Sequence, residues 1–109
     1  RAPQLSGEVM TCGPLTLDSA RREVLAHGKP VKIGLTEFKL LTFFMAHPER
    51  VFSRSQLLDG VWGDHVFIEE RTIDVHMLRL RKALAPHDLQ SMVQTVRGLG
   101  YRLSQRAET

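Results

Sequence analysis

The sequence of 109 residues is poor in cysteine and contains no long apolar segment. Its one cysteine, Cys12, excludes an internal disulfide, and no basic neighbour favours an activated thiolate. We therefore expect Cys12 to be a buried apolar side chain in a reducing, cytoplasmic protein. The longest apolar run, residues 40–46, contains a threonine and is far shorter than the ~20 residues of a membrane-spanning helix.

The first residues also lack the apolar stretch of a signal peptide, and the chain does not begin with methionine. We expect it to be one domain excised from a longer protein, because 109 residues suit one domain better than two.

The sequence has no motif of metal, nucleotide or nucleophile chemistry. The five histidines, at positions 27, 47, 65, 76 and 87, do not follow metal-ligand spacing. Neither GxxxxGK[ST] nor GxGxxG occurs, and Asp74 and His76 are two residues apart on an expected helix, so they do not face each other. The sequence therefore predicts a protein that is not an enzyme and has no metal site and no cofactor.

Positive charge is concentrated in the last third of the chain. Residues 1–70 carry eight basic and nine acidic side chains, whereas residues 71–106 carry seven basic and two acidic ones. A net charge of +5 in one region is typical of a surface that binds a polyanion. The alternative at this point is a solvated surface that happens to be basic.

The first third of the chain predicts a small antiparallel sheet. Short segments with apolar–polar alternation occupy residues 9–12, 15–17, 24–26 and 30–33, and turn residues separate them. Pro30 suits the start of a strand or the edge of a sheet, because proline has no backbone N–H to donate.

The pattern then changes to helical spacing. Thr36 is predicted to cap a helix that ends near His47, before Pro48, and Ser53 with Gln56 has the spacing of a capping box. This box opens a short helix, with Leu57, Leu58 and Val61 inward, that ends between residues 60 and 62. Its neighbour Trp62 is expected to pack against the core, to contact a phosphate or partner, or both.

A third helix is predicted over residues 70–84. Its apolar residues Ile73, Met77, Leu80 and Leu84 fall within an arc of about 60°, which predicts one buried stripe beside polar and basic faces. Residues 93–96 and 101–104 alternate and flank the turn Arg97-Gly98-Leu99-Gly100, which predicts a β-hairpin.

Two short helices before a longer basic helix suggest a helix-turn-helix that binds DNA. Thr72 and Val75 are expected to contact thymine methyl groups, and Arg79 is expected to pair with guanine. An arginine at a hairpin tip, Arg97, suits a minor groove. Further side chains on the helix suit phosphates, namely Arg71, His76 and Arg81. A surface helix with a solvated charged face is the alternative, as is a protein-interaction module whose basic face docks an acidic partner.

Four segments resemble, in order, the C-terminal effector domain of OmpR/PhoB-type response regulators: TEFKLLTFFMAHPERVFSRSQLL (36–58), VWG (61–63), ERTIDVHMLRLRKAL (70–84) and VQTVRGLGYRLS (93–104). The resemblance covers residues 8–104, which leaves 1–7 as a linker remnant and 105–109 as a tail. It implies an α+β winged helix-turn-helix, with a four-stranded antiparallel sheet, three helices and a hairpin wing. Several segments look most like the phosphate-responsive members of the family.

The resemblance also implies the residues that contact DNA and RNA polymerase. The base-contacting positions are Thr72, Asp74, Val75, Arg79 and, in the minor groove, Arg97. The backbone-contacting positions are Trp62, Arg71, His76, Arg81, Thr95, Gly98 and Tyr101. The loop 62–70 matches a segment that contacts a sigma subunit of RNA polymerase, with Trp62, Gly63, Ile68 and Glu70 as the contacting residues. The further implied partners are an N-terminal receiver domain, and a second copy bound head-to-tail on direct repeats in double-stranded DNA.

Three positions depart from the pattern of the phosphate-responsive members. Leu78 stands where they usually have arginine, which predicts one phosphate contact fewer. Ser55 replaces a usual acidic residue, which weakens the expectation of a polymerase contact there, and Leu99 stands where threonine is common.

Overall fold

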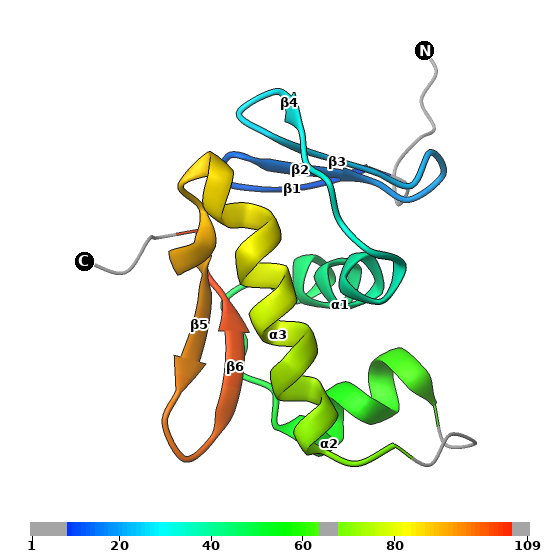
Figure 1. Ribbon diagram of the computed structural model, residues 1–109, viewed down its shortest axis with the longest axis vertical. Coiled ribbons are helices and arrows are strands. Elements are labelled where there is room, and N and C mark those ends of the chain that lie inside the picture. Colours follow the sequence, from blue (N-terminus) through cyan, green and yellow to red (C-terminus); the bar gives the residue numbers. More distant parts are fainter. Residues whose placement is uncertain (1–8, 64–67, 106–109) are drawn as a thin grey trace.

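The computed structural model describes residues 9–63 and 68–105. It has an N-terminal sheet that covers one end of a helical layer, and a C-terminal hairpin that lies beside the longest helix (Figure 1). The α+β architecture of a winged helix-turn-helix is confirmed.

The N-terminal sheet is antiparallel with the order β1-β2-β3-β4. Its strands are β1 (Val9–Cys12), β2 (Leu15–Asp18), β3 (Glu23–Ala26) and β4 (Lys29–Pro30). Leu17 pairs with Met10 on one side and Val24 on the other, so alternate residues of β2 and β3 face the core. Cys12 is 1% exposed, as expected, and burial, with the nearby Glu49, raises the pKa of its thiol.

The predicted strand 30–33 is wrong beyond its first residue, because β4 ends at Pro30. The amide of Val31 still donates to the carbonyl of Val24 over 2.9 Å, but the chain then turns away to reach the first helix. Pro30 lies at the edge of the sheet, where its missing N–H removes no ladder bond.

Helix α1 (Leu35–Ala46) begins earlier than predicted, because its N-cap is Gly34 and not Thr36. The carbonyl of Gly34 accepts from the amide of Phe38 over 2.8 Å, so Thr36 already lies within the first turn. The preference of threonine for a capping position contributes only a small free energy. It therefore does not prevent the helix from beginning earlier, where the amide of Phe38 bonds the carbonyl of Gly34. The apolar face is buried as predicted, through Phe38, Leu40, Leu41, Phe44 and Met45.

Helix α2 (Arg54–Leu57) has the predicted capping box. The hydroxyl of Ser53 accepts from the amide of Gln56 over 3.1 Å, and the Gln56 side chain accepts from the amide of Ser53 over 2.8 Å. The helix continues as one wide π-type turn, η2 (Leu58–Trp62). Leu57 is fully buried, whereas Leu58 and Val61, also predicted to face inward, are only partly buried against the core.

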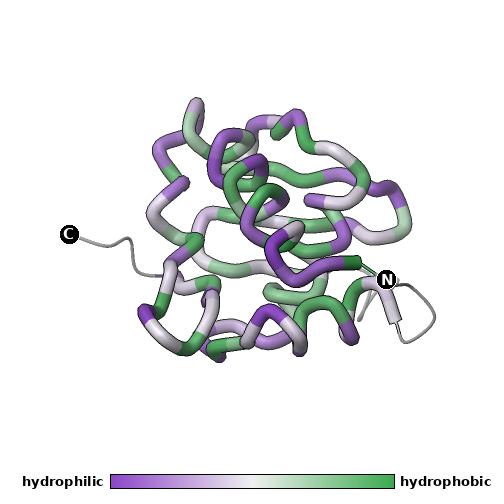
Figure 2. The backbone as a smooth tube through the Cα atoms, turned by 60° about the horizontal axis from the view of Figure 1, so that its bottom comes forward, coloured by the Kyte–Doolittle hydropathy of each residue, from purple (hydrophilic) through white to green (hydrophobic). Residues whose placement is uncertain are grey.

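Helix α3 (Arg71–Leu84) buries the predicted stripe of Ile73, Met77, Leu80 and Leu84. Two short 3-10 turns, η3 (Ala85–His87) and η4 (Gln90–Met92), lead into the hairpin of β5 (Val93–Val96) and β6 (Gly100–Leu103). Hydrophilic and hydrophobic residues alternate along the backbone of the helices, as expected for elements with one buried face (Figure 2). No helix in the described ranges is long and apolar enough to cross a membrane.

The hairpin is joined to the segment between α1 and α2. Phe52 and Tyr101 exchange two backbone hydrogen bonds, of 2.8 and 2.9 Å, and the amide of Glu49 donates to the carbonyl of Leu103 over 2.8 Å. This close approach depends on Gly100, which has φ +147° and has no room for a Cβ atom beside the carbonyl of Phe52.

Candidate nucleic-acid interface

The N-terminal half of α3 and the hairpin lie side by side and end at the same side of the molecule (Figure 1). The surface of α3 that is not buried exposes Val75 and Arg79 and partly exposes Thr72. Within the described part of the chain, Arg79 has no ion-pair partner, so its guanidinium is available to an external ligand. Three of the predicted base-contacting side chains therefore share one accessible face.

The hairpin tip also presents its predicted residues to solvent. Arg97, Gly98 and Leu99 are all exposed, and Leu99 is 64% exposed. Gly98 has φ +79°, a left-handed conformation that glycine adopts without steric cost. A groove of about 250 Å³ runs between this tip and the N-terminal ends of α2 and α3, and its lining includes Arg54, Glu70 and Thr95.

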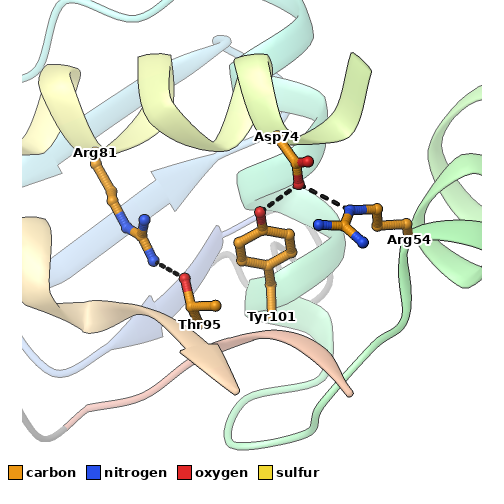
Figure 3. A network of polar contacts seen from close by, with 5 residues as sticks. All are labelled: Arg54, Asp74, Arg81, Thr95 and Tyr101. Atoms are coloured by element: carbon orange, nitrogen blue, oxygen red, sulfur yellow. Dashed lines mark hydrogen bonds and ion pairs between the residues drawn. The ribbon is translucent and has the colours of Figure 1, made fainter. Parts of the chain in front are cut away.

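Arg81 connects α3 to the hairpin. Its Nε donates to the carbonyl of Val93 over 2.9 Å, and its Nη2 donates to the hydroxyl of Thr95 over 2.5 Å (Figure 3). Its guanidinium carbon lies 5.9 Å from the centre of the Tyr101 ring. Two predicted phosphate-contacting residues, Arg81 and Thr95, are thus brought together from different elements, and the hairpin is held at a fixed distance from α3.

Asp74 is the meeting point of three elements (Figure 3). Its Oδ1 accepts from the hydroxyl of Tyr101, on β6, over 2.5 Å and from Nε of Arg54, on α2, over 2.9 Å. The hydrogen bond from Arg54 is the main cause that lowers the pKa of Asp74; burial opposes it, and the bond from Tyr101 adds to it. Burial first, and then the bond to Asp74, raise the pKa of the Tyr101 hydroxyl.

His76 faces away from this cluster and joins α3 to α1. Its Nδ1 lies 2.7 Å from Oε2 of Glu37, and the two side chains are 15% and 9% exposed. The ring of Trp62 lies 5.6 Å from the His76 ring, centre to centre, so Trp62 packs partly against the core. Among the described residues, Glu37 contacts Nδ1 of the His76 ring, and the second ring nitrogen, Nε2, is left for another partner.

The predicted polymerase-contacting segment is described only at its ends. Trp62 and Gly63 close η2, Ile68 is partly buried and Glu70 is exposed beside the start of α3. Residues 64–67 of the predicted loop lie outside the described residues. Arg71, in the first turn of α3, is exposed and pairs with Glu69 over 2.7 Å.

Two residues that sequence reasoning missed hold this surface together, namely Arg54 and Glu37. Arg54 follows the cap of α2 and contacts a residue 20 positions later, and Glu37 contacts one 39 positions later. Glu37 lies in the first turn of α1, where an acidic side chain is favourable beside the positive end of the helix, and no local pattern indicates that either residue contacts α3. The described residues contain no group of side chains suited to hold a metal ion.

Comparison with known proteins identifies the family. Residues 28–103 match the family described as "Transcriptional regulatory protein, C terminal". The chain is 55% identical over 96% of its length to the phosphate regulon transcriptional regulatory protein PhoB of Escherichia coli, and 54% identical over 87% to PhoB of Pseudomonas aeruginosa. It spans 46% and 41% of those two proteins, so it corresponds to less than half of each.

Solved structures agree with this result. The DNA-binding domain of the response regulator AdeR, in complex with an intercistronic region, is 33% identical with a TM-score of 0.76, and the match covers 84% of this chain and 94% of that domain. The DNA-binding domain of Klebsiella pneumoniae RstA, in complex with the RstA box, is 27% identical with a TM-score of 0.76, over 91% and 99% of the two chains. The chain belongs to the family of C-terminal domains of transcriptional regulatory proteins, the OmpR/PhoB-type DNA-binding effector domains, which are regulators and not enzymes.

Proposed function

We propose that this domain binds double-stranded DNA in a sequence-specific manner, with α3 in the major groove and the hairpin tip in the adjacent minor groove. The observation that carries the proposal is the side-by-side arrangement of the exposed face of α3 and the basic hairpin tip, which Arg81 holds together through Thr95. Two neighbouring elements of this kind engage two neighbouring grooves of one duplex.

The base-reading residues in this proposal are those on the accessible face of α3. Arg79 pairs with a guanine, Thr72 and Val75 contact thymine methyl groups, and Asp74 accepts from a cytosine amino group. Because Asp74 is ionised and partly exposed, it has acceptor capacity for such a bond.

The phosphate-contacting residues surround this face. His76 uses Nε2, since Glu37 occupies Nδ1, and the other members of the set are Trp62, Arg71, Arg81, Thr95 and Gly98. The hydroxyl of Tyr101 has one proton, which it donates to Asp74, so we assign Tyr101 to Asp74 and not to a phosphate. Because the contacts are largely ionic, affinity is expected to fall steeply as salt increases.

The test is a titration of the domain with a direct-repeat duplex and with a scrambled duplex of the same composition, each at two salt concentrations. The expected result is tighter binding of the direct repeat at both concentrations, and a negative dependence of affinity on salt for both duplexes. Equal affinity for the two duplexes at both salt concentrations contradicts sequence-specific binding and favours a basic surface that docks an acidic protein partner.

Arg97 is expected to read minor-groove shape. The variant Arg97→Ala should weaken binding most at sites whose flanking A·T-rich segment has a narrow minor groove, because negative potential is strongest there. The measurement is the affinity of wild type and variant for duplexes that differ only in that flank. A loss that is equal for all flanks means that Arg97 does not enter the groove.

In the whole protein, we propose that the domain is the cytoplasmic effector half of a phosphate-responsive regulator, controlled by an N-terminal receiver domain. The similarity to PhoB from two organisms supports this role. Two copies would bind head-to-tail on direct repeats about one helical turn apart.

We also propose that the segment 62–70 contacts a sigma subunit of RNA polymerase, through Trp62, Gly63, Ile68 and Glu70. Substitution of Ile68 or Glu70 by alanine should reduce activated transcription in a reconstituted system several-fold while DNA affinity stays unchanged. A parallel loss of DNA affinity would instead place the segment at the DNA contact.

A further inference from the structure

Asp74 is an acidic side chain on a surface that is proposed to meet a polyanion, so its presence there requires a physical reason. Its two carboxylate oxygens are used differently. Oδ1 accepts from both Tyr101 and Arg54, whereas Oδ2 accepts no hydrogen bond from any residue in the described ranges. The side chain remains 40% exposed, so the open acceptor is within reach of an external donor.

Two hydrogen bonds from two different elements restrict how the carboxylate can rotate. The terminal torsion of an aspartate is broad when nothing holds it, so a free Asp74 on a helix surface would sample many orientations. Tyr101 approaches from β6 and Arg54 approaches from α2, so they reach the Asp74 carboxylate from two different directions on the same side of α3 (Figure 3). With Oδ1 held by both, the plane of the carboxylate and the position of Oδ2 are set before a ligand arrives.

The charge of the cluster is also balanced. Arg54 is positively charged and lies 2.9 Å from Asp74, so the pair presents little net negative charge to an approaching phosphate backbone. The Tyr101 hydroxyl is neutral and directs its proton to the same oxygen. The protein can therefore keep an ionised acceptor at the DNA surface without strong repulsion from the phosphates.

We infer that Arg54 and Tyr101 are specificity-determining residues that touch no base themselves and act by positioning Asp74 to read a cytosine amino group. The inference rests on the proposed DNA-binding function and adds to it two residues from outside the reading face of α3. Direct readout of cytosine requires an acceptor in a defined position, which the two bonds to Oδ1 supply.

The experiment measures the affinity of three single variants for a cognate duplex and for duplexes changed at one base pair at a time. Asp74→Ala should reduce discrimination at a single base pair by about 10-fold. Tyr101→Phe and Arg54→Lys should reduce discrimination at that same base pair by about 3-fold. Phenylalanine removes only the hydroxyl. Lysine keeps the positive charge, but its ammonium sits at the end of a flexible chain and does not donate from the position of the Arg54 Nε, so Oδ1 of Asp74 is no longer held at the same place.

A double variant separates positioning from independent contacts. If Tyr101 acts through Asp74, adding Tyr101→Phe to Asp74→Ala should cause no further loss of discrimination. The matched control is Arg71→Ala, an exposed arginine in the first turn of α3 that pairs only with Glu69 among described residues. It should weaken all duplexes by a similar factor and leave base preference unchanged.

A spectroscopic measurement tests the geometry without DNA, because Tyr101 is the only tyrosine in the chain. Alkaline titration of its absorbance should show a lower pKa in Asp74→Ala than in wild type, since the bond to Asp74 raises the pKa of the hydroxyl. An unchanged Tyr101 pKa overturns the inference, because the hydroxyl is then not bonded to the carboxylate.

Two further results would overturn it. One is that the single variants Tyr101→Phe and Arg54→Lys each weaken binding to all duplexes equally, which would make both residues phosphate contacts. The other is a loss of discrimination in Asp74→Ala alone, which means that Asp74 reads without help. If the wild-type domain itself shows no base preference, the proposed sequence-specific binding is wrong. That result is distinguishable because it appears before any substitution is made.

Discussion

The variant Gly100→Ala is expected to destabilise the domain by about 3 kcal/mol or more, by a combination of backbone strain and overpacking. Gly100 has φ +147°, which residues with a side chain rarely adopt, and an added Cβ would sit almost on the carbonyl oxygen of Phe52. The clash is with backbone, which cannot move aside as a flexible side chain would. To make room for the Cβ atom, β6 must move away from Phe52 and break the two backbone hydrogen bonds between Phe52 and Tyr101.

Thermal unfolding of the two proteins measures this effect, with an expected decrease in melting temperature of roughly 10 °C or more. Gly98→Ala is the matched control in the same hairpin. Gly98 has φ +79°, but nothing lies within 4 Å of the position of its Cβ, so only the strain of about 1 kcal/mol is expected. Equal destabilisation by the two substitutions would show that the close approach of β6 to Phe52 does not add to the cost of a Cβ atom at position 100.

The variant Arg79→Ala is expected to weaken binding to a cognate duplex by about 1–3 kcal/mol and to relax the preference at one base pair. The guanidinium of Arg79 is exposed on α3 and has no ion-pair partner in the described part of the chain, so no protein contact competes with a guanine. Arginine donates two parallel hydrogen bonds to guanine, and alanine donates none.

The measurement compares wild type and variant on duplexes that carry each of the four base pairs at that position. Arg21→Ala is the matched control, because Arg21 is an arginine of the same charge in the turn between β2 and β3, away from the N-terminal end of α3 (Figure 1). It should change affinity little and preference not at all. If Arg79→Ala instead weakens cognate and random duplexes by one factor, Arg79 contacts a phosphate and reads no base.

Much of the fold follows from periodicity along the sequence. The buried stripe of α3, the apolar face of α1 and the capping box of Ser53 and Gln56 were all predicted and are present. These features depend on residues three to four positions apart, which the sequence shows directly. The predictions that fail, a cap at Thr36 and a strand through residues 31–33, concern ends of elements, where small local preferences yield to the path of the chain.

The candidate site was predictable only in part. Charge and spacing indicate which side chains of α3 and the hairpin tip reach solvent, and Thr72, Val75, Arg79 and Arg97 do so. The same reasoning predicted His76 as a phosphate contact but did not indicate that its side chain lies against Glu37 and is only 15% exposed. Burial of that kind depends on which helix packs opposite, and a helical wheel contains no information about a second helix.

The sequence by itself determined the family, the element order and the basic last third, because each is written in local pattern or in composition. Tertiary structure alone decided how these elements form one surface. Arg54 meets Asp74 across 20 positions of chain and Tyr101 meets it across 27, and neither spacing follows the period of any helix or strand. Such contacts form only when the core packs α2, α3 and the hairpin together. They fix the orientation of the Asp74 carboxylate, which is an acidic acceptor on a basic surface.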